Sequence, residues 1–169
     1  MTLRDERRQR CDRRRRIAPG VRHALGARKV VAVDCDNTLW DGVCGEDGAQ
    51  AVRLTPERKA LQEFMRRQSE AGMLLCLCTK NNEADIEEVF TSRFDFPLRR
   101  EHFVARKVNW HRKSENLKAL ARELNVGLDS FIFIDDNPME CAEVEANCPG
   151  VLALRLPDEA EQIPGFLEH

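Results

Sequence analysis

Two carboxylates that lie one residue apart near the start of the chain are the first side chains whose types and spacing suggest chemistry. Asp34 and Asp36 follow residues 30–33, an apolar, β-branched run that is typical of a buried strand. Acidic side chains at the carboxyl end of a central strand are costly to bury unless a cation lies between them. The pattern therefore predicts a bound metal ion at this point.

Polar clusters follow two later apolar runs in the same way. They comprise Thr79, Lys80 and Asn81 after residues 73–78, and Asp135 and Asp136 after residues 130–134. In an open parallel sheet the carboxyl ends of the strands line one crevice, so residues about 100 positions apart are expected to converge there. The predicted ligands of this metal site are Asp34, Asp36, Asp135 and Asp136. Such hard oxygen ligands, without an imidazole or thiolate motif, favour Mg²⁺.

This set of residues suits phosphoryl chemistry. A carboxylate can attack phosphorus to give an aspartyl phosphate, while a second carboxylate serves as acid and base. We expect Mg²⁺ to offset the repulsion between Asp34 and an incoming phosphate, and Lys113 and the Thr79 hydroxyl to hold the phosphate oxygens. Each feature alone has an ordinary explanation, as a helix cap, a solvated lysine or a turn residue. Their order along the chain favours the catalytic interpretation.

The framework that must position these residues is predicted from the alternation of strands and helices. The expected strands are residues 30–33, 73–78, 102–105, 130–134 and 151–156, and the expected helices are residues 56–71, 83–90, 114–124 and 139–147, with Gly72 and Gly127 ending the first and third helices. Short loops between them indicate a Rossmann-like three-layer α/β/α fold with a parallel sheet. Three glycines in residues 41–48 favour a hairpin or flap over a helix. Residues 41–54 and 81–112 leave no room for a folded cap domain.

Composition and charge place the chain among globular proteins with one domain. It has 169 residues, of which 42% are hydrophobic and 33% charged. Ten arginines against three acids give residues 1–28 a net charge of +7, which leaves −9 for the rest of a chain whose total is −2. We expect a basic, flexible leader over residues 1–28, a catalytic domain over 29–158 and a C-terminal tail over 159–169. No aromatic residue is interleaved with the leader's arginines, so nucleic acid is not an expected partner.

Location follows from the same composition. No apolar run approaches the roughly 20 residues that span a bilayer, and no apolar stretch of the kind found in secretory signals follows the basic start. The seven cysteines lack CxxC or zinc-type spacing. We expect reduced thiols, a cytoplasmic protein and no membrane partner.

The order of these motifs resembles the haloacid dehalogenase (HAD) superfamily of phosphotransferases over nearly all of residues 29–156. The shared features are DxDNT, an apolar strand ending in Thr, a Lys before a helix, and an apolar strand ending in Asp-Asp. The resemblance implies that Asp34 is the nucleophile and Asp36 the general acid/base. It further implies phosphate binding by Thr79 and Lys113, and Mg²⁺ binding by Asp135 with Asp136 beside it.

A finer resemblance is to the FkbH-like branch of that superfamily. It is carried by DNTLWDGVCGEDG, CTKNNEADIEEVF, NW..K..NL and LNVGLDSFIFIDDNP. Members of that branch load a glyceryl unit from 1,3-bisphosphoglycerate onto acyl carrier proteins for polyketide synthesis, and relatives are often longer. An uncapped crevice would be open to a carrier protein with a thiol arm. The alternative function is a stand-alone HAD phosphatase acting on a phosphorylated small molecule or protein.

Thiol transfer singles out two cysteines and several neighbouring residues. The acyl group needs either direct attack by the carrier thiol or a protein cysteine that holds it first. Cys35, between the two acids, is the first candidate, although strand alternation would turn it away from them. Cys44 in the flap is the second, and both have a packing role as the alternative. The further residues expected to contact substrate are Asn37, Trp40, Lys80 and Asn81.

Overall fold

The centre of the molecule is a parallel sheet of five strands. The computed structural model describes residues 25–168. The strand order is β3-β2-β1-β4-β5, and every neighbouring pair is parallel. The strands are β1 Val30–Val33, β2 Leu74–Thr79, β3 Phe103–Val108, β4 Phe131–Asp135 and β5 Leu152–Arg155. Because β1 lies between β2 and β4, the three strands that carry the predicted site are neighbours.

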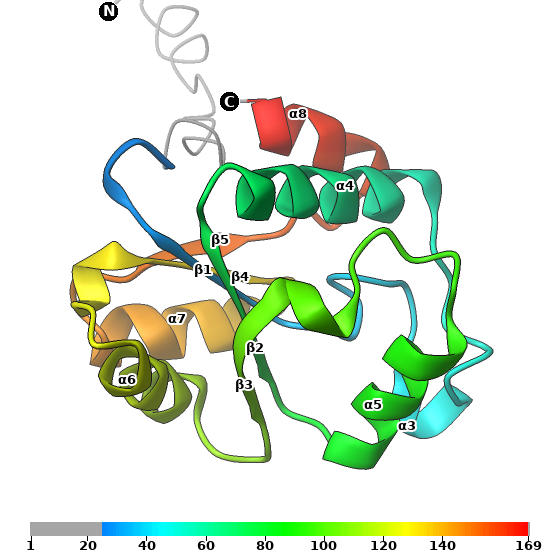
Figure 1. Ribbon diagram of the computed structural model, residues 1–169, viewed down its shortest axis with the longest axis horizontal. Coiled ribbons are helices and arrows are strands. Elements are labelled where there is room, and N and C mark those ends of the chain that lie inside the picture. The colour runs from blue at the N-terminus through cyan, green and yellow to red at the C-terminus, as the bar shows by residue number, and fades with distance from the viewer. Residues whose placement is uncertain (1–24, 169) are drawn as a thin grey trace, which may run out of the picture.

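Helices cover both faces of this sheet (Figure 1). They are α3 Cys44–Asp47, α4 Pro56–Glu70, α5 Glu83–Ser92, α6 Lys113–Leu124, α7 Pro138–Asn147 and α8 Ile163–Glu168. Short 3-10 turns are η1 Leu25–Ala27, η2 Arg100–His102, η3 Leu128–Ser130 and η4 Ala160–Gln162. Val31 and Val33 of β1 pack in a core with α4, α5 and α8, whereas Val30 and Ala32 pack in a second core with α6 and α7. The predicted three-layer α/β/α fold is confirmed.

Helix ends follow the sequence in one case and depart from it in another. Thr55 caps α4 by accepting a hydrogen bond from the Arg58 N–H at 3.4 Å. The sequence predicted that Gly127 ends α6, but the residue that ends it is Asn125, which adopts the left-handed conformation with φ 53°. Asparagine tolerates this conformation better than most residues with a side chain, so Asn125 ends the helix after Leu124, the last residue predicted for it.

The third strand is longer than the predicted residues 102–105. β3 pairs with β2 as far as Val108 opposite Thr79. Its second half contains Arg106 and Lys107, which reach Glu87 and Glu123 at 3.1 and 2.7 Å. Charged side chains are usual on an edge strand, where they discourage pairing with other chains. These charged residues interrupt the apolar pattern of the sequence, so the second half of β3 was not predicted.

The segment after β1 is a flap, as predicted, but it contains a helical turn. Residues 41–53 close through paired backbone bonds between Asp41 and Arg53, and α3 lies between them. The Asp47 carboxylate accepts the Val43 N–H at 3.0 Å, and Asp36 accepts the Cys44 N–H at 3.0 Å. The prediction of no helix here was wrong because these side chains satisfy the first N–H groups of the turn. Within residues 25–168 no separate cap domain covers the sheet edge.

The end of the described chain packs on the rest of it. Ile163 and Leu167 of α8 are buried in the same core as α4. No helix among residues 25–168 combines the length and apolar character needed to cross a membrane. A basic leader was predicted over residues 1–28, of which residues 1–24 lie outside the described part of the chain. The predicted domain boundaries stay a prediction.

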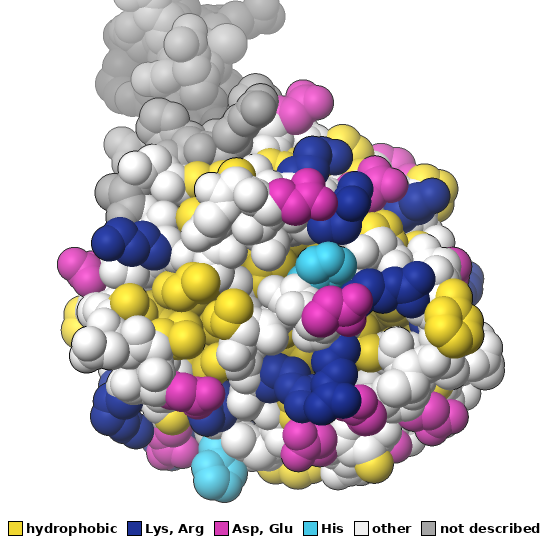
Figure 2. All heavy atoms as spheres, in the orientation of Figure 1, with side chains coloured by type: hydrophobic (Ala, Val, Ile, Leu, Met, Phe, Trp, Pro, Cys, Tyr) yellow, Lys and Arg dark blue, Asp and Glu magenta, His cyan; other side chains and the backbone are white. Residues whose placement is uncertain are grey.

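Charges of both signs are interspersed over the face shown in Figure 2. Ion pairs among the described residues include those of Arg100 and Arg106, which both contact Glu87, at 2.7 and 3.1 Å. This face therefore does not present a continuous basic surface.

Candidate active site

The ends of β1, β2 and β4 bring the predicted residues together. The Asp34 N–H donates to the Ile134 carbonyl at 3.0 Å, which continues the pairing of β1 with β4 up to the site. Thr79, the last residue of β2, is buried beside them, and Asp135 is the last residue of β4. The expected convergence of residues from distant parts of the sequence is thus observed.

Three carboxylates form a cluster at this point. Oxygens of Asp34, Asp135 and Asp136 lie within 4.8 Å of one another. Lys113 Nζ donates to Asp34 Oδ1 at 2.6 Å and to the Cys78 carbonyl at 2.7 Å, and lies 3.1 Å from Asp135 Oδ2. Three carboxylates against one ammonium leave negative charge uncompensated, and Asp135 Oδ2 has no hydrogen bond of its own. This donor set fits Mg²⁺, which prefers carboxylate oxygens.

Burial and mutual repulsion perturb the ionisation of the cluster. Burial, followed by the charge of Asp34, raises the pKa of Asp135 to about 7 against the opposing effect of Lys113. The same two causes raise the pKa of Asp136. Burial alone would lower the pKa of Lys113, but Asp34 and Asp135 raise it above its usual value. Lys113 is therefore a permanent cation next to Asp34.

Asp36 lies outside the three-acid cluster, although it was predicted as one of four metal ligands. Its carboxylate accepts hydrogen bonds from Trp40 Nε1 at 2.8 Å, the Cys44 N–H at 3.0 Å and Asn81 Nδ2 at 2.6 Å. These donors come from the flap and the end of β2, so they hold Asp36 toward the flap. Asp36 is therefore held by the flap and the end of β2, and the catalytic role predicted for it stays a prediction.

Trp40 and Asn37 lie in the loop after β1, where Trp40 is buried and Asn37 is half-buried. Trp40 is fully buried between Phe90 and Phe96, with ring centroids at 6.0 and 5.8 Å. Asn37 adopts φ 56°, and its Oδ1 accepts the Gly42 N–H at 3.0 Å. Both residues hold the shape of the loop after β1, and their predicted contact with substrate stays a prediction.

Lys80 and Asn81 lie at the same edge of the sheet. Lys80 forms an ion pair of 2.7 Å with Glu140 at the start of α7. Asn81 is 4% exposed and links Asp36 to Cys44, whose Sγ it approaches at 3.5 Å. Asn81 therefore orients the predicted acid/base and the flap together.

Neither candidate cysteine is placed to carry an acyl group. Cys35 is fully buried in the core that contains Val31 and Val33, so the alternation of the strand continues through it. Burial, followed by the charges of Asp34 and Asp36, raises its pKa well above the usual value. Cys44 is 3% exposed, and burial together with Asp36 raises its pKa to about 12. Because thiolates are the reactive form, burial and the raised pKa favour the packing alternative for both cysteines, and acyl transfer through Cys35 stays an untested prediction.

Other residues support the site without having been predicted to do so. Thr38 Oγ1 donates to Asp136 Oδ1 at 3.1 Å and accepts the Asp136 N–H at 3.2 Å, which joins β1 to β4. Asn109 and Asn116 exchange side-chain hydrogen bonds of 3.1 and 2.8 Å on either side of Lys113. The repeated asparagines of NW..K..NL were a signal for this pair, whereas Thr38 followed only from its place in DxDNT.

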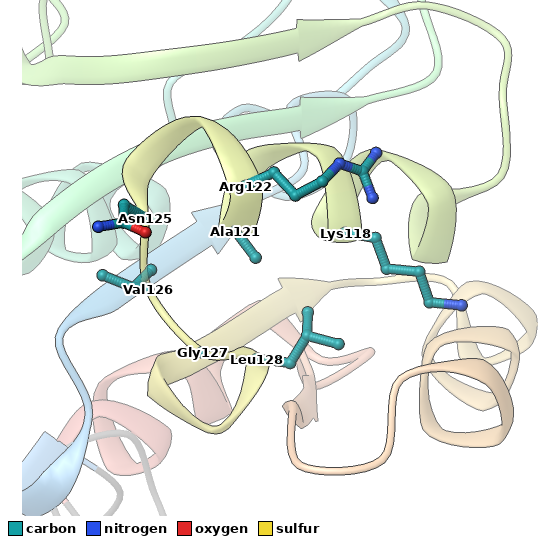
Figure 3. A pocket seen from close by; sticks show the side chains of 7 residues that line it. All are labelled: Lys118, Ala121, Arg122, Asn125, Val126, Gly127 and Leu128. Carbon is teal, nitrogen blue, oxygen red and sulfur yellow. The ribbon is translucent and has the colours of Figure 1, made fainter.

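A shallow groove lies at the opposite end of α6 from Lys113 (Figure 3). Its lining residues are Lys118, Ala121, Arg122, Asn125, Val126, Gly127 and Leu128. It contains no carboxylate or thiol, so the chemistry described above belongs to the strand ends.

Comparison with known proteins finds similar solved structures. No protein-family model and no curated protein sequence matches the chain. Among solved structures, it is similar to the N-terminal part of a Bacteroides fragilis protein that contains a phosphatase domain and is complexed with Mg. The TM-score is 0.81 and the identity 31%, over 85% of this chain and 40% of that one.

More distant structures share the fold. A HAD family enzyme from Bacteroides thetaiotaomicron, in complex with magnesium and inorganic phosphate, has TM-score 0.57 and 12% identity over 77% of this chain and 94% of that one. The cobalt-bound deoxy-D-mannose-octulosonate 8-phosphate phosphatase from Haemophilus influenzae has TM-score 0.55 and 14% identity, over 77% and 70%.

The predicted fold is therefore confirmed, since the chain has the core fold of HAD-type phosphatases. It spans about 40% of the length of the Bacteroides fragilis chain that it matches. What the whole protein does is consequently taken up as a proposal.

Proposed function

We propose that this protein is a Mg²⁺-dependent phosphatase of the HAD type, with Asp34 as the nucleophile. The observation that carries the proposal is the cluster at the strand ends. There, Asp34 is paired with a buried lysine and lies among two further carboxylates that fit a divalent cation. The similarity to a Mg-complexed phosphatase domain at 31% identity supports the same assignment.

The residues suggest the following chemistry. An Asp34 oxygen attacks phosphorus and forms an aspartyl phosphate, while the bond from phosphorus to the leaving oxygen breaks. Asp36, in its acid form, gives a proton to that oxygen and then takes one from the water that hydrolyses the intermediate. Lys113 and the Thr79 hydroxyl bind phosphate oxygens. Mg²⁺ held by Asp34, Asp135 and Asp136 would reduce the repulsion between Asp34 and phosphate.

Replacement of the nucleophile tests this assignment. We expect Asp34→Asn to lower kcat by at least about 1000-fold with p-nitrophenyl phosphate and Mg²⁺, because the amide cannot form the acyl phosphate. Steady-state phosphate release measures the effect, and wild type in excess EDTA serves as the metal-free comparison. An Asp34→Asn enzyme that keeps wild-type turnover would exclude the aspartyl mechanism.

We further propose, from the FkbH-like motifs, that the substrate is 1,3-bisphosphoglycerate and that the glyceryl group goes to the phosphopantetheine thiol of an acyl carrier protein. The uncapped site of the described residues supports a large acceptor. Since Cys35 and Cys44 are both buried, we favour direct attack. The carrier thiolate attacks the acyl carbon, the carbon–oxygen bond to phosphate breaks, and phosphate leaves. The second phosphate is removed through Asp34.

Intact mass of a carrier protein tests the transfer. With 1,3-bisphosphoglycerate and Mg²⁺, we expect a glyceryl adduct on the holo carrier that also forms with Cys35→Ala and Cys44→Ala. Phosphate release without an adduct on any carrier would contradict the transfer. It would leave the stand-alone phosphatase as the second candidate, in which the buried Cys35 and Cys44 only pack.

A further inference from the structure

A carboxylate on α7 holds the first turn of α6, and we propose that this residue, Glu143, positions Lys113 for the reaction. The inference rests on the phosphatase function proposed above. It assigns a role to a residue that lies outside every motif at the strand ends and that touches neither Asp34 nor the phosphate site.

Glu143 caps α6 from outside the helix. Its Oε2 accepts the Ser114 N–H at 3.1 Å, and its Oε1 accepts the Ser114 hydroxyl at 2.5 Å. Arg112, at the N-cap position of α6, makes no side-chain cap hydrogen bond. The free N–H groups at a helix start need an acceptor, and a carboxylate there also interacts favourably with the helix dipole. Glu143, on α7, thus accepts hydrogen bonds at the start of α6, where the N-cap residue makes no side-chain cap hydrogen bond.

The capped residue is the neighbour of Lys113. Lys113 is the first residue of α6 and Ser114 the second. Lys113 is 2% exposed, its ammonium donates to Asp34 and to the Cys78 carbonyl, and it forms an ion pair with Asp135 at 3.1 Å. A shift of the first turn of α6 would therefore displace Nζ from at least one of these partners.

A second residue of α7 holds the Glu143 side chain in place. Asn147, one turn later on α7, donates from Nδ2 to the Glu143 carbonyl at 2.8 Å and to Oε1 at 3.3 Å. Ser114 is 3% exposed, so its hydroxyl has little water to replace a lost carboxylate. The chain of contacts from Asn147 through Glu143 and Ser114 to Lys113 joins α7 to the reacting group.

Kinetics of a matched series test the role. Glu143→Ala is expected to lower kcat for p-nitrophenyl phosphate by about 10- to 100-fold, the size of effect produced by misplacing a catalytic group. Glu143→Gln keeps the length and an acceptor oxygen, so it should restore most of that loss. Glu145→Ala, on the same helix and exposed, should keep the wild-type kcat.

A second measurement does not depend on activity. An amine-reactive reagent is applied to the folded proteins, and peptide mass spectrometry reads the labelling of Lys113 against exposed Lys59. Labelling of Lys113 should be negligible in wild type and Glu145→Ala, and clear in Glu143→Ala below its melting temperature. Wild-type kcat and no labelling in Glu143→Ala would overturn the proposal, even if its melting temperature falls. If wild type and Asp34→Asn are equally inactive, the phosphatase function fails, and the labelling alone decides the positioning role.

Discussion

Asp135 shares one lysine with Asp34, and its carboxylate is 2% exposed, so its charge is poorly compensated in the metal-free protein. Its pKa is raised to about 7, mainly by burial and then by Asp34. The unfolded chain has the lower pKa, so the folded protein binds more protons between pH 4 and 7, and stability falls as pH rises through this window. We expect a loss on the order of 1–3 kcal/mol in EDTA.

Melting temperatures in EDTA from pH 5 to pH 8 measure this loss. In Asp135→Asn the group cannot ionise, so the fall with pH should be smaller than in wild type. Equal pH profiles for the two proteins would show that Asp135 does not titrate in this range.

Among residues, the carboxylates and Lys113 could be predicted from the sequence, because their types are costly to bury without a purpose. The direction in which the Asp36 carboxylate points could not be predicted. It depends on Trp40 and Asn81, whose positions follow from the flap and β2. The burial of Cys35 could not be predicted with certainty because the strand's alternation can relax where the strand ends, at Asp34. The alternation continues for one more residue and buries the thiol.

At the scale of elements, the strands and helices with an apolar face were predictable, as in α4 with its Thr55 cap and Pro56 start. α3 was missed because its stabilising contacts come from Asp36 and Asp47 side chains and not from a periodic pattern. The cap of α6 was missed for the same reason. Glu143 is 29 positions from Ser114, and only the packing of α7 against α6 brings the two together. The spacing of motifs along the chain therefore located the site, whereas the contacts between elements that complete it could not be predicted from the sequence.

At the scale of the whole molecule, the acidic cluster should oppose folding in the absence of metal and favour it in its presence. Asp34, Asp135 and Asp136 approach one another against the balance of a single lysine. A cation that binds only the folded state stabilises it by about 2.7 kcal/mol at 100 times its dissociation constant. For a domain of this size that amounts to a rise of roughly 5–10 °C in Tm.

Thermal melts at pH 8 with EDTA or with saturating Mg²⁺ measure this linkage. Mg²⁺ should raise the Tm of wild type by this amount. The increase should be much smaller in Asp135→Asn, because one of the three ligands has lost its charge. In EDTA, Asp135→Asn should melt at or above wild type, since a repulsive carboxylate is gone and the amide oxygen still accepts the Asn137 N–H that Asp135 accepts at 2.9 Å. Asp129→Asn, an exposed acid before β4, should behave as wild type in both conditions. An Mg²⁺-dependent rise of equal size in wild type and Asp135→Asn would place the metal elsewhere.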